Sequence, residues 1–245
     1  MRIIDLREVS LPISRYADPS APSGGLNTSM LALITNVIRD GKPVVGYGFA
    51  SIGRFAQSGL IRERFAPRLL AASEADLTDD AGTNLDPFRA WRMTNERPGG
   101  HGERCVAVGA LDMALWDAAA KIARLPLYRL LMERTGTPQR DAPRRVSVYA
   151  GGGYYYPSDD IARLSDEVRC FRDLGYRRAK IKIGSAPLAQ DLKRIDAAAR
   201  LLDGPGNVAV DAIYAYTPAT SLEVADALAP RGLWWFEDIC DQPLL

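Results

Sequence analysis

The stretch AKIKIG, residues 179–184, decides the fold of the second half of the chain. Its alternation places Lys180 and Lys182 on one face of a strand and Ile181 and Ile183 on the other. Predicted helices and strands alternate around it: helices at 158–176, 187–204 and 221–230, and strands at 146–153, 207–216 and 233–239. Four strands separated by three helices, with a repeat of about thirty residues, indicate parallel βα units. Such units either close into an eight-stranded barrel or lie in an open, doubly wound sheet.

The first half of the chain has a different pattern. Strands are predicted at 2–13, 31–38 and 44–50, with an Asp-Gly turn between the second and the third. Helical stretches follow, the longest over 103–136, which Pro126 interrupts and Gly136 ends. We therefore predict an α/β protein with an α+β capping domain over residues 1–143 and a (β/α) domain over residues 144–245. The loops at 14–29 and 51–59 are candidate lids over a site.

Composition excludes several classes of function. The 245 residues are 47 % hydrophobic and 25 % charged, and the net charge of +1 includes no long run of either sign. This balance argues against a nucleic-acid or membrane surface. Three widely spaced cysteines, Cys105, Cys170 and Cys240, fit a reducing compartment rather than a disulfide framework. Charges near the N-terminus and the lack of a long apolar window predict a soluble, cytoplasmic protein.

Charged residues stand at the ends of three predicted strands. Lys180 and Lys182 lie on the second strand of the (β/α) domain, Asp211 follows NVAV on the third, and Glu237 follows LWWF on the fourth. In parallel architectures, functional residues collect at the carboxyl ends of strands. A single acid at such a position is often only a helix N-cap. Acids on consecutive strands beside a lysine pair instead indicate one shared site at the carboxyl ends of the strands.

The pattern indicates a reaction at the carbon atom next to the carboxylate of a substrate. Two carboxylates at one site repel each other unless a cation lies between them, and oxygen ligands without Cys or His favour Mg²⁺ or Mn²⁺. A metal there would bind the carboxylate of an organic acid and acidify its α-proton. A lysine beside a second lysine has its pKa lowered by the like charge, so it can accept that proton.

These residues resemble the mandelate racemase-like branch of the enolase superfamily. The resemblance includes GALDMALWDAAAKIARLPLYRLL (109–131), KIK (180–182), VDA (210–212) and FED (236–238). Within the branch, the loop strings PGGHGER and YYYP are similar to those of acid-sugar dehydratases of the D-tartrate dehydratase type. The resemblance implies a capping domain, the first half of a TIM-like barrel, Mg²⁺, and a small hydroxy acid or acid sugar as substrate. It also implies a homo-oligomer.

The resemblance assigns roles to the charged residues. Lys182 would be the base on the α-carbon, and Lys180 would support it and contact the substrate carboxylate. Asp211 and Glu237 would be the first two Mg²⁺ ligands. Proton removal would give an ene-diolate, and loss of the β-hydroxyl from it would complete a dehydration. A racemase or epimerase of the same superfamily would share the first step and differ only in the second.

Several residues depart from the dehydratase pattern. Ile213 stands where the family has an amide side chain, and Ala50 and Ile52 stand where asparagines are expected. Arg54 and Arg97 are candidate substrate-binding residues in the capping domain, although Arg97 replaces an expected lysine, which changes the geometry of any contact. These departures bear on the choice of substrate more than on dehydration itself.

The last predicted strand is the fourth of a barrel that takes about 250 residues by itself. The third metal ligand and the acid/base histidine expected on later strands are not among these residues. The one histidine, His101, lies in the loop at 98–104, where it either packs or contacts substrate. We therefore expect little or no dehydratase turnover from these residues alone. The chain would then be a truncated frame, a half-barrel completed by another copy, or part of a larger enzyme.

Two further classes of protein stay open at this point. One is a catalytically silent fragment or pseudoenzyme that at most assembles with a partner. The other is a phosphate-binding α/β protein, suggested by the glycines at 151–153. Those glycines lack the spacing of a phosphate loop, so a turn ahead of packed tyrosines at 154–156 explains them better.

Overall fold

The computed structural model describes residues 1–12, 27–50, 56–94, 103–137 and 145–240. These residues form two compact units, one built on an antiparallel sheet and the other on a parallel sheet. The predicted class, a mixed α/β protein with an α+β first domain, is confirmed. Within the described part of the chain, no helix combines the length and the apolar character that a bilayer crossing requires.

The sheet of the first unit is a three-stranded meander. Strands β1 (Ile3–Pro12), β2 (Asn27–Arg39) and β3 (Lys42–Phe49) pair antiparallel in the order β1-β2-β3. The turn between β2 and β3 is the predicted Asp40-Gly41 pair, with φ of 48° and 73°, the left-handed backbone that a two-residue hairpin requires. Strand β2 begins at Asn27, so the end of the predicted loop at 14–29 is strand.

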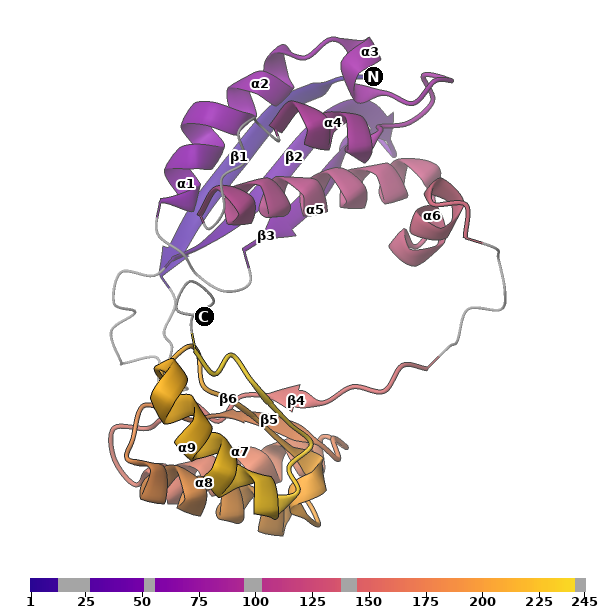
Figure 1. Ribbon diagram of the computed structural model, residues 1–245. Helices are drawn as coiled ribbons and strands as arrows, with labels where there is room; N and C mark the ends of the chain where they lie inside the picture. The colour runs from indigo at the N-terminus through magenta and orange to yellow at the C-terminus, as the bar shows by residue number, and fades with distance from the viewer. Residues whose placement is uncertain (13–26, 51–55, 95–102, 138–144, 241–245) are drawn as a thin grey trace. The chain divides into compact units, whose positions relative to one another are not determined.

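Helices cover one face of this sheet (Figure 1). The helices of this unit are α1 (Gln57–Gly59), the π-helical turn η1 (Leu60–Phe65), α2 (Ala66–Ala71), α3 (Glu74–Leu77), α4 (Pro87–Thr94), α5 (Glu103–Ala123) and α6 (Leu127–Arg134), of which α1, α2 and α5 contact the strands. The predicted break at Pro126 lies between α5 and α6. The described part of the predicted lid at 51–59 is helical from Gln57, so the expectation of a loop there is wrong.

Helix α5 packs directly on β3 because two glycines allow it. A Cβ at Gly46 would lie 2.0 Å from the backbone oxygen of Ala114, and one at Gly48 would lie 2.2 Å from that of Ala110. Any larger residue would force the helix away from the sheet. The core between them contains fully buried side chains from the sheet and the helices, among them Leu33, Phe65, Leu111 and Leu115.

The second unit is the predicted succession of βα units. It contains β4 (Ala150–Gly151), α7 (Asp160–Asp173), β5 (Ala179–Lys182), α8 (Leu188–Leu201), η2 (Pro205–Asn207), β6 (Val208–Asp211), α9 (Pro218–Leu228), η3 (Ala229–Arg231) and β7 (Trp235–Glu237). The strands pair parallel in the order β4-β5-β6-β7. Strand β4 is much shorter than the predicted 146–153.

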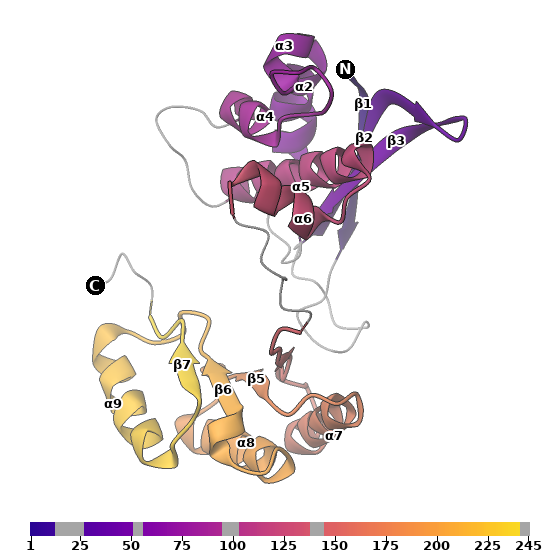
Figure 2. The same ribbon diagram turned by 90° about the vertical axis from the view of Figure 1, so that its right-hand side faces the viewer.

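The two faces of this sheet differ sharply. Helices α7, α8 and α9 lie along one face (Figure 2), where Ile181, Val208 and Val210 are fully buried with helix residues such as Leu164 and Ile195. The period-two alternation of β5 sends its lysines to the opposite face. A polar cluster is thereby placed on the face without these helices.

Candidate functional site

Strand register brings the predicted charges together. Lys182 pairs with Asp211 on the neighbouring strand, and Asp211 pairs with Glu237 on the next. Directly paired residues of parallel strands share a face, and Lys180, two residues before Lys182, shares it too. The four side chains therefore lie together at the carboxyl ends of β5, β6 and β7.

Ion pairs link all four residues. The Lys182 ammonium donates to Asp211 Oδ2 at 2.5 Å, and the Lys180 ammonium lies 2.6 Å from Glu237 Oε1 and 3.1 Å from Asp211 Oδ2. The Asp211 side chain is only 4 % exposed, whereas Glu237 is 34 % exposed. The cluster is thus buried at its centre and opens to solvent on the Glu237 side.

The electrostatics differ from the prediction. Burial opposes the charge on Lys180, but hydrogen bonds and attraction from Glu237 and Asp211 outweigh it and raise the pKa of this amine. Burial likewise opposes the charge on Asp211, yet hydrogen bonds from Lys182 and Lys180 hold the pKa of the carboxyl below its usual value. Lys180 therefore does not have the lowered amine pKa that a neighbouring lysine alone would give, because its ammonium has carboxylate partners.

Two further hydrogen bonds orient the acids. The backbone N–H of Ile213 donates to Asp211 Oδ1 at 3.0 Å, and the Trp235 indole N–H donates to Glu237 Oε2 at 2.6 Å. Asp211 does not cap the helix that follows it, because Thr217 caps α9. The backbone N–H of Ile213 thus orients Asp211, although the Ile213 side chain has no amide group.

A third acid joins the site. One carboxylate oxygen each from Asp211, Glu237 and Asp238 lies within 4.8 Å of the other two. Asp238 is exposed, and the left-handed backbone at this residue, with φ of 49°, turns the chain after β7. Sequence reasoning missed Asp238, although its place beside Glu237 in FED is a visible signal. Three hard oxygen donors at this spacing fit a divalent cation such as Mg²⁺.

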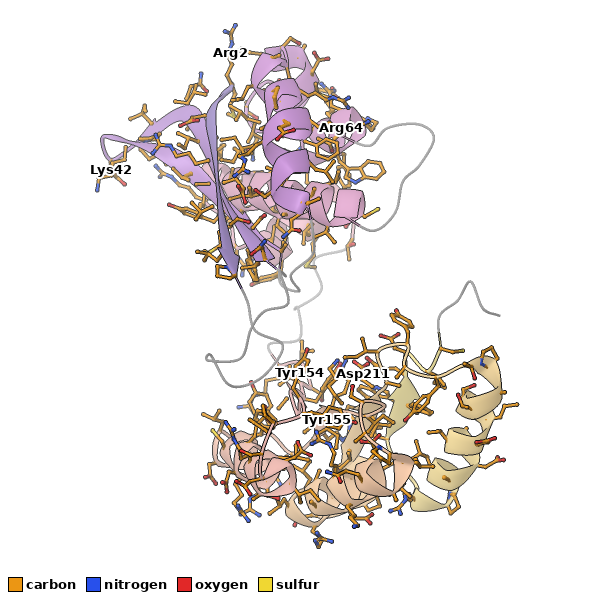
Figure 3. All side chains as sticks on the ribbon, turned by 90° about the vertical axis from the view of Figure 1, so that its left-hand side faces the viewer. Arg2, Lys42, Arg64, Tyr154, Tyr155 and Asp211 are labelled. Atoms are coloured by element: carbon orange, nitrogen blue, oxygen red, sulfur yellow. The ribbon has the colours of Figure 1, made fainter. Side chains whose placement is uncertain are left out.

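An aromatic ring lies against the base candidate. Lys182 Nζ is 5.3 Å from the centre of the Tyr154 ring, a cation–π distance, and Figure 3 shows Tyr154 and Asp211 at the same end of the sheet. The glycines ahead of Tyr154 serve packing. Gly153 N–H donates to Glu167 at 3.2 Å, and a Cβ on Gly153 would lie 2.6 Å from Ile181. The phosphate-loop alternative finds no support at these residues.

Two models from one family match the chain over most of its length. The mandelate racemase / muconate lactonizing enzyme N-terminal domain matches residues 25–132, and the enolase C-terminal domain-like model matches residues 163–244. The chain belongs to the mandelate racemase and muconate lactonizing enzyme branch of the enolase superfamily.

Characterised relatives in this superfamily include acid-sugar dehydratases. Arabinonate dehydratase of Saccharolobus solfataricus is 32 % identical over 142 residues, which are 58 % of this chain and 36 % of the relative. L-talarate/galactarate dehydratase of Salmonella typhimurium is 27 % identical over 213 residues, 86 % of this chain and 50 % of the relative. The chain therefore spans no more than half the length of either curated relative.

Solved structures of the superfamily share the fold. A racemase from Streptomyces coelicolor A3(2) with bound magnesium superimposes with a TM-score of 0.70 at 24 % identity, over 98 % of this chain and 63 % of the racemase. The two units are accordingly the α+β capping domain and the first four strands of a TIM-like barrel.

Several predicted residues lie outside the described parts of the chain. They are the substrate-binding candidates Arg54 and Arg97, together with Ile52 and His101. Ala50 is described and is buried, 5 % exposed, at the end of β3. The site described here is therefore the cluster of acids and lysines on the barrel strands, with the ring of Tyr154.

Proposed function

We propose that this chain carries the metal and base half of an acid-sugar lyase site, which removes the proton α to a carboxylate from a small hydroxy acid or acid sugar. The observation that carries the proposal is the convergence of Lys180 and Lys182 with three carboxylates on one face of the sheet. The relatives that are acid-sugar dehydratases support this substrate class.

Each residue has a chemical role in this proposal. Asp211, Glu237 and Asp238 would hold Mg²⁺, which when bound supplies positive charge to the substrate carboxylate and to the acids. Lys180 would donate a hydrogen bond to the substrate carboxylate. Lys182 would leave Asp211, lose a proton to solvent and, as a neutral amine, accept the α-proton. Loss of the β-hydroxyl would then make the reaction a dehydration.

Metal binding tests the first part. We expect Asp211→Asn and Glu237→Gln to weaken Mg²⁺ binding in a calorimetric titration by about tenfold or more, because each removes a charged oxygen ligand. Asp166→Asn, in a surface ion pair with Arg169, is the matched control and should bind Mg²⁺ as the unaltered chain does. Equal affinity for Mg²⁺ in the unaltered chain and the three variants would favour the catalytically silent fragment or pseudoenzyme.

Isotope exchange tests the base without requiring dehydration. In D₂O with Mg²⁺ and arabinonate, galactarate or tartrate, the unaltered chain should replace the α-proton of the acid with deuterium. Proton NMR measures this exchange as the loss of the α-proton signal. Lys182→Arg should abolish this exchange, because a guanidinium keeps its charge but stays protonated. Exchange that persists in Lys182→Arg would exclude Lys182 as the base. Exchange with inversion at the α-carbon and no loss of hydroxyl would show a racemase.

A further inference from the structure

Helix α8 carries two charged residues that the proposed chemistry does not use. Asp191 and Arg194 are both fully buried, 0 % exposed. Charged side chains are seldom buried to this degree unless they are paired and hydrogen-bonded. Their contacts lead to Lys182 from two sides.

Arg194 holds the loop that follows β4. Its guanidinium donates to the carbonyl oxygen of Gly153 at 2.6 Å, forms an ion pair with Asp160 at the start of α7, and lies 4.1 Å from the centre of the Tyr155 ring. The same Gly153 oxygen accepts the backbone N–H of Lys182 at 3.2 Å. Arg194 therefore fixes the carbonyl group to which the backbone of Lys182 is bound.

Asp191 holds the loop that follows β5. Its Oδ2 accepts the N–H of Gly184, two residues after Lys182, at 2.8 Å. Its Oδ1 accepts the hydroxyl of Tyr155, and that hydroxyl accepts the N–H of Ser185 at 3.2 Å. The loops that follow β4 and β5 are thus both bound to α8, and they are bound to each other through Tyr155.

Tyr154 is placed by the same contacts. It directly follows Gly153, whose φ of 66° turns the chain, and its ring lies against the Lys182 ammonium. A lysine side chain is flexible and has no planar fork to fix its direction, so its ammonium is held only by what surrounds it. Here the surroundings are the Asp211 carboxylate and the Tyr154 ring.

We propose that Asp191 and Arg194 are positioning residues, which fix the backbone around Lys182 and the ring of Tyr154 beside its ammonium. The catalytic meaning of this arrangement rests on the proposed function, in which Lys182 is the base. A base must be held close to the productive geometry for proton transfer, and small displacements lower the rate strongly. The buried pair on α8 supplies that restraint without contacting the substrate.

Lysine NMR tests the positioning without metal or turnover. The sequence has few lysines, so a chain labelled with ¹³C-lysine gives a small set of assignable signals: Lys42, Lys121, Lys180, Lys182 and Lys193. The Cε protons of Lys182 should lie upfield of those of the exposed Lys42 and Lys193, because of the Tyr154 ring. Tyr154→Leu should remove this shift.

Two variants are decisive, one in the buried pair and one at Tyr155, which is hydrogen-bonded to Asp191, and both are compared with one control. Asp191→Asn and Tyr155→Phe should each lose most of the upfield shift of Lys182. Tyr155→Phe keeps the ring over Arg194, so it gives an answer even where Asp191→Asn does not fold. The matched control is Asp196→Asn, on the same helix and also paired with an arginine, Arg231, and it should keep the shift. An unchanged Lys182 signal in folded Asp191→Asn or in Tyr155→Phe would overturn the proposal.

Exchange kinetics add a second readout. Asp191→Asn should lower the rate of α-proton exchange at saturating substrate severalfold more than it raises KM, and Arg194→Lys should retain more of that rate than Arg194→Met. A purely structural role would lower thermal stability and leave the exchange per folded molecule unchanged, which would also overturn the proposal. If the unaltered chain neither binds Mg²⁺ nor exchanges protons, the proposed function fails, while the lysine signals still decide the positioning.

Discussion

At the scale of single residues, Asp211 is the centre of the charged cluster. Both ammonium groups lie within hydrogen-bond distance of its Oδ2, and the N–H of Ile213 donates to its Oδ1. It is almost fully buried, so it depends on these partners for the solvation that water would otherwise provide. Its removal leaves Lys180 and Lys182 without the one carboxylate oxygen that contacts both ammonium groups.

This arrangement predicts how stability depends on pH. The pKa of Asp211 is lower in the folded chain than its usual value, so its ion pairs stabilise the fold above that value and are lost as pH falls through the folded pKa. Without divalent cations, Asp211→Asn should reduce the free energy of unfolding by about 3 kcal/mol near neutral pH, because it removes the carboxylate that pairs with the largely buried Lys182 ammonium. The difference in the free energy of unfolding between this variant and the unaltered chain should shrink as pH falls to about 2.

Urea unfolding in the presence of EDTA, at several pH values, measures this prediction. Asp196→Asn, whose pair with Arg231 is far more exposed, is the control and should cost less than about 1 kcal/mol at neutral pH. If the difference in the free energy of unfolding between Asp211→Asn and the unaltered chain stays constant down to acidic pH, the ion pairs of Asp211 do not stabilise the fold as described.

At the scale of elements, the short strand β4 and the loop after it depend on Gly153. The backbone there is left-handed, and a Cβ would lie 2.6 Å from both Cβ and Cγ2 of Ile181 on β5. Gly175, before β5, has a φ of 94° but nothing within 4 Å of a Cβ. The two glycines therefore both have a positive φ and differ in the space around them.

This pair separates backbone strain from packing. Gly175→Ala should destabilise the fold by about 1 kcal/mol through strain alone. Gly153→Ala should cost roughly 1–3 kcal/mol more, because its methyl group overpacks the sheet against Ile181. Chemical denaturation of both variants measures the difference, and equal losses would show that the contact with Ile181 relaxes without penalty.

At the scale of the whole molecule, the described residues form two separate hydrophobic cores. Leu111 of α5 is fully buried in the first unit, and Leu164 of α7 is fully buried in the second. Each unit has its own sheet and its own covering helices. Each core is therefore able to stabilise its own unit.

Matched leucine truncations test this division. Leu111→Ala and Leu164→Ala should each destabilise their own unit by about 2–5 kcal/mol through the cavity that they leave. Hydrogen exchange followed by mass spectrometry should show faster exchange mainly in α5 and its sheet for the first variant, and in α7 and β5 for the second. If either variant accelerates exchange equally in both units, the two cores are not independent.

Much of this architecture was predictable from local patterns. The alternation of lysine and isoleucine in AKIKIG set the two faces of β5, the Asp40-Gly41 pair marked the hairpin, and Pro126 marked a helix boundary. Each depends on residues close together in the chain. The length of β4 was not predictable, because the residues before Ala150 lack a paired partner strand and only the register with β5 shows where pairing begins.

The sequence by itself determined which faces of the strands are apolar, the order of the βα units, and which charges stand at the strand ends, because periodicity and turn chemistry are local properties of the chain. Only the tertiary structure decided which charges neutralise each other, that Asp238 joins Asp211 and Glu237, and that α8 holds both loops beside Lys182. Lys180 and Glu237 are 57 positions apart, and Arg194 and Gly153 are 41 apart. Such contacts depend on how strands and helices pack, and the hydrogen bonds formed across that packing raise the pKa of Lys180.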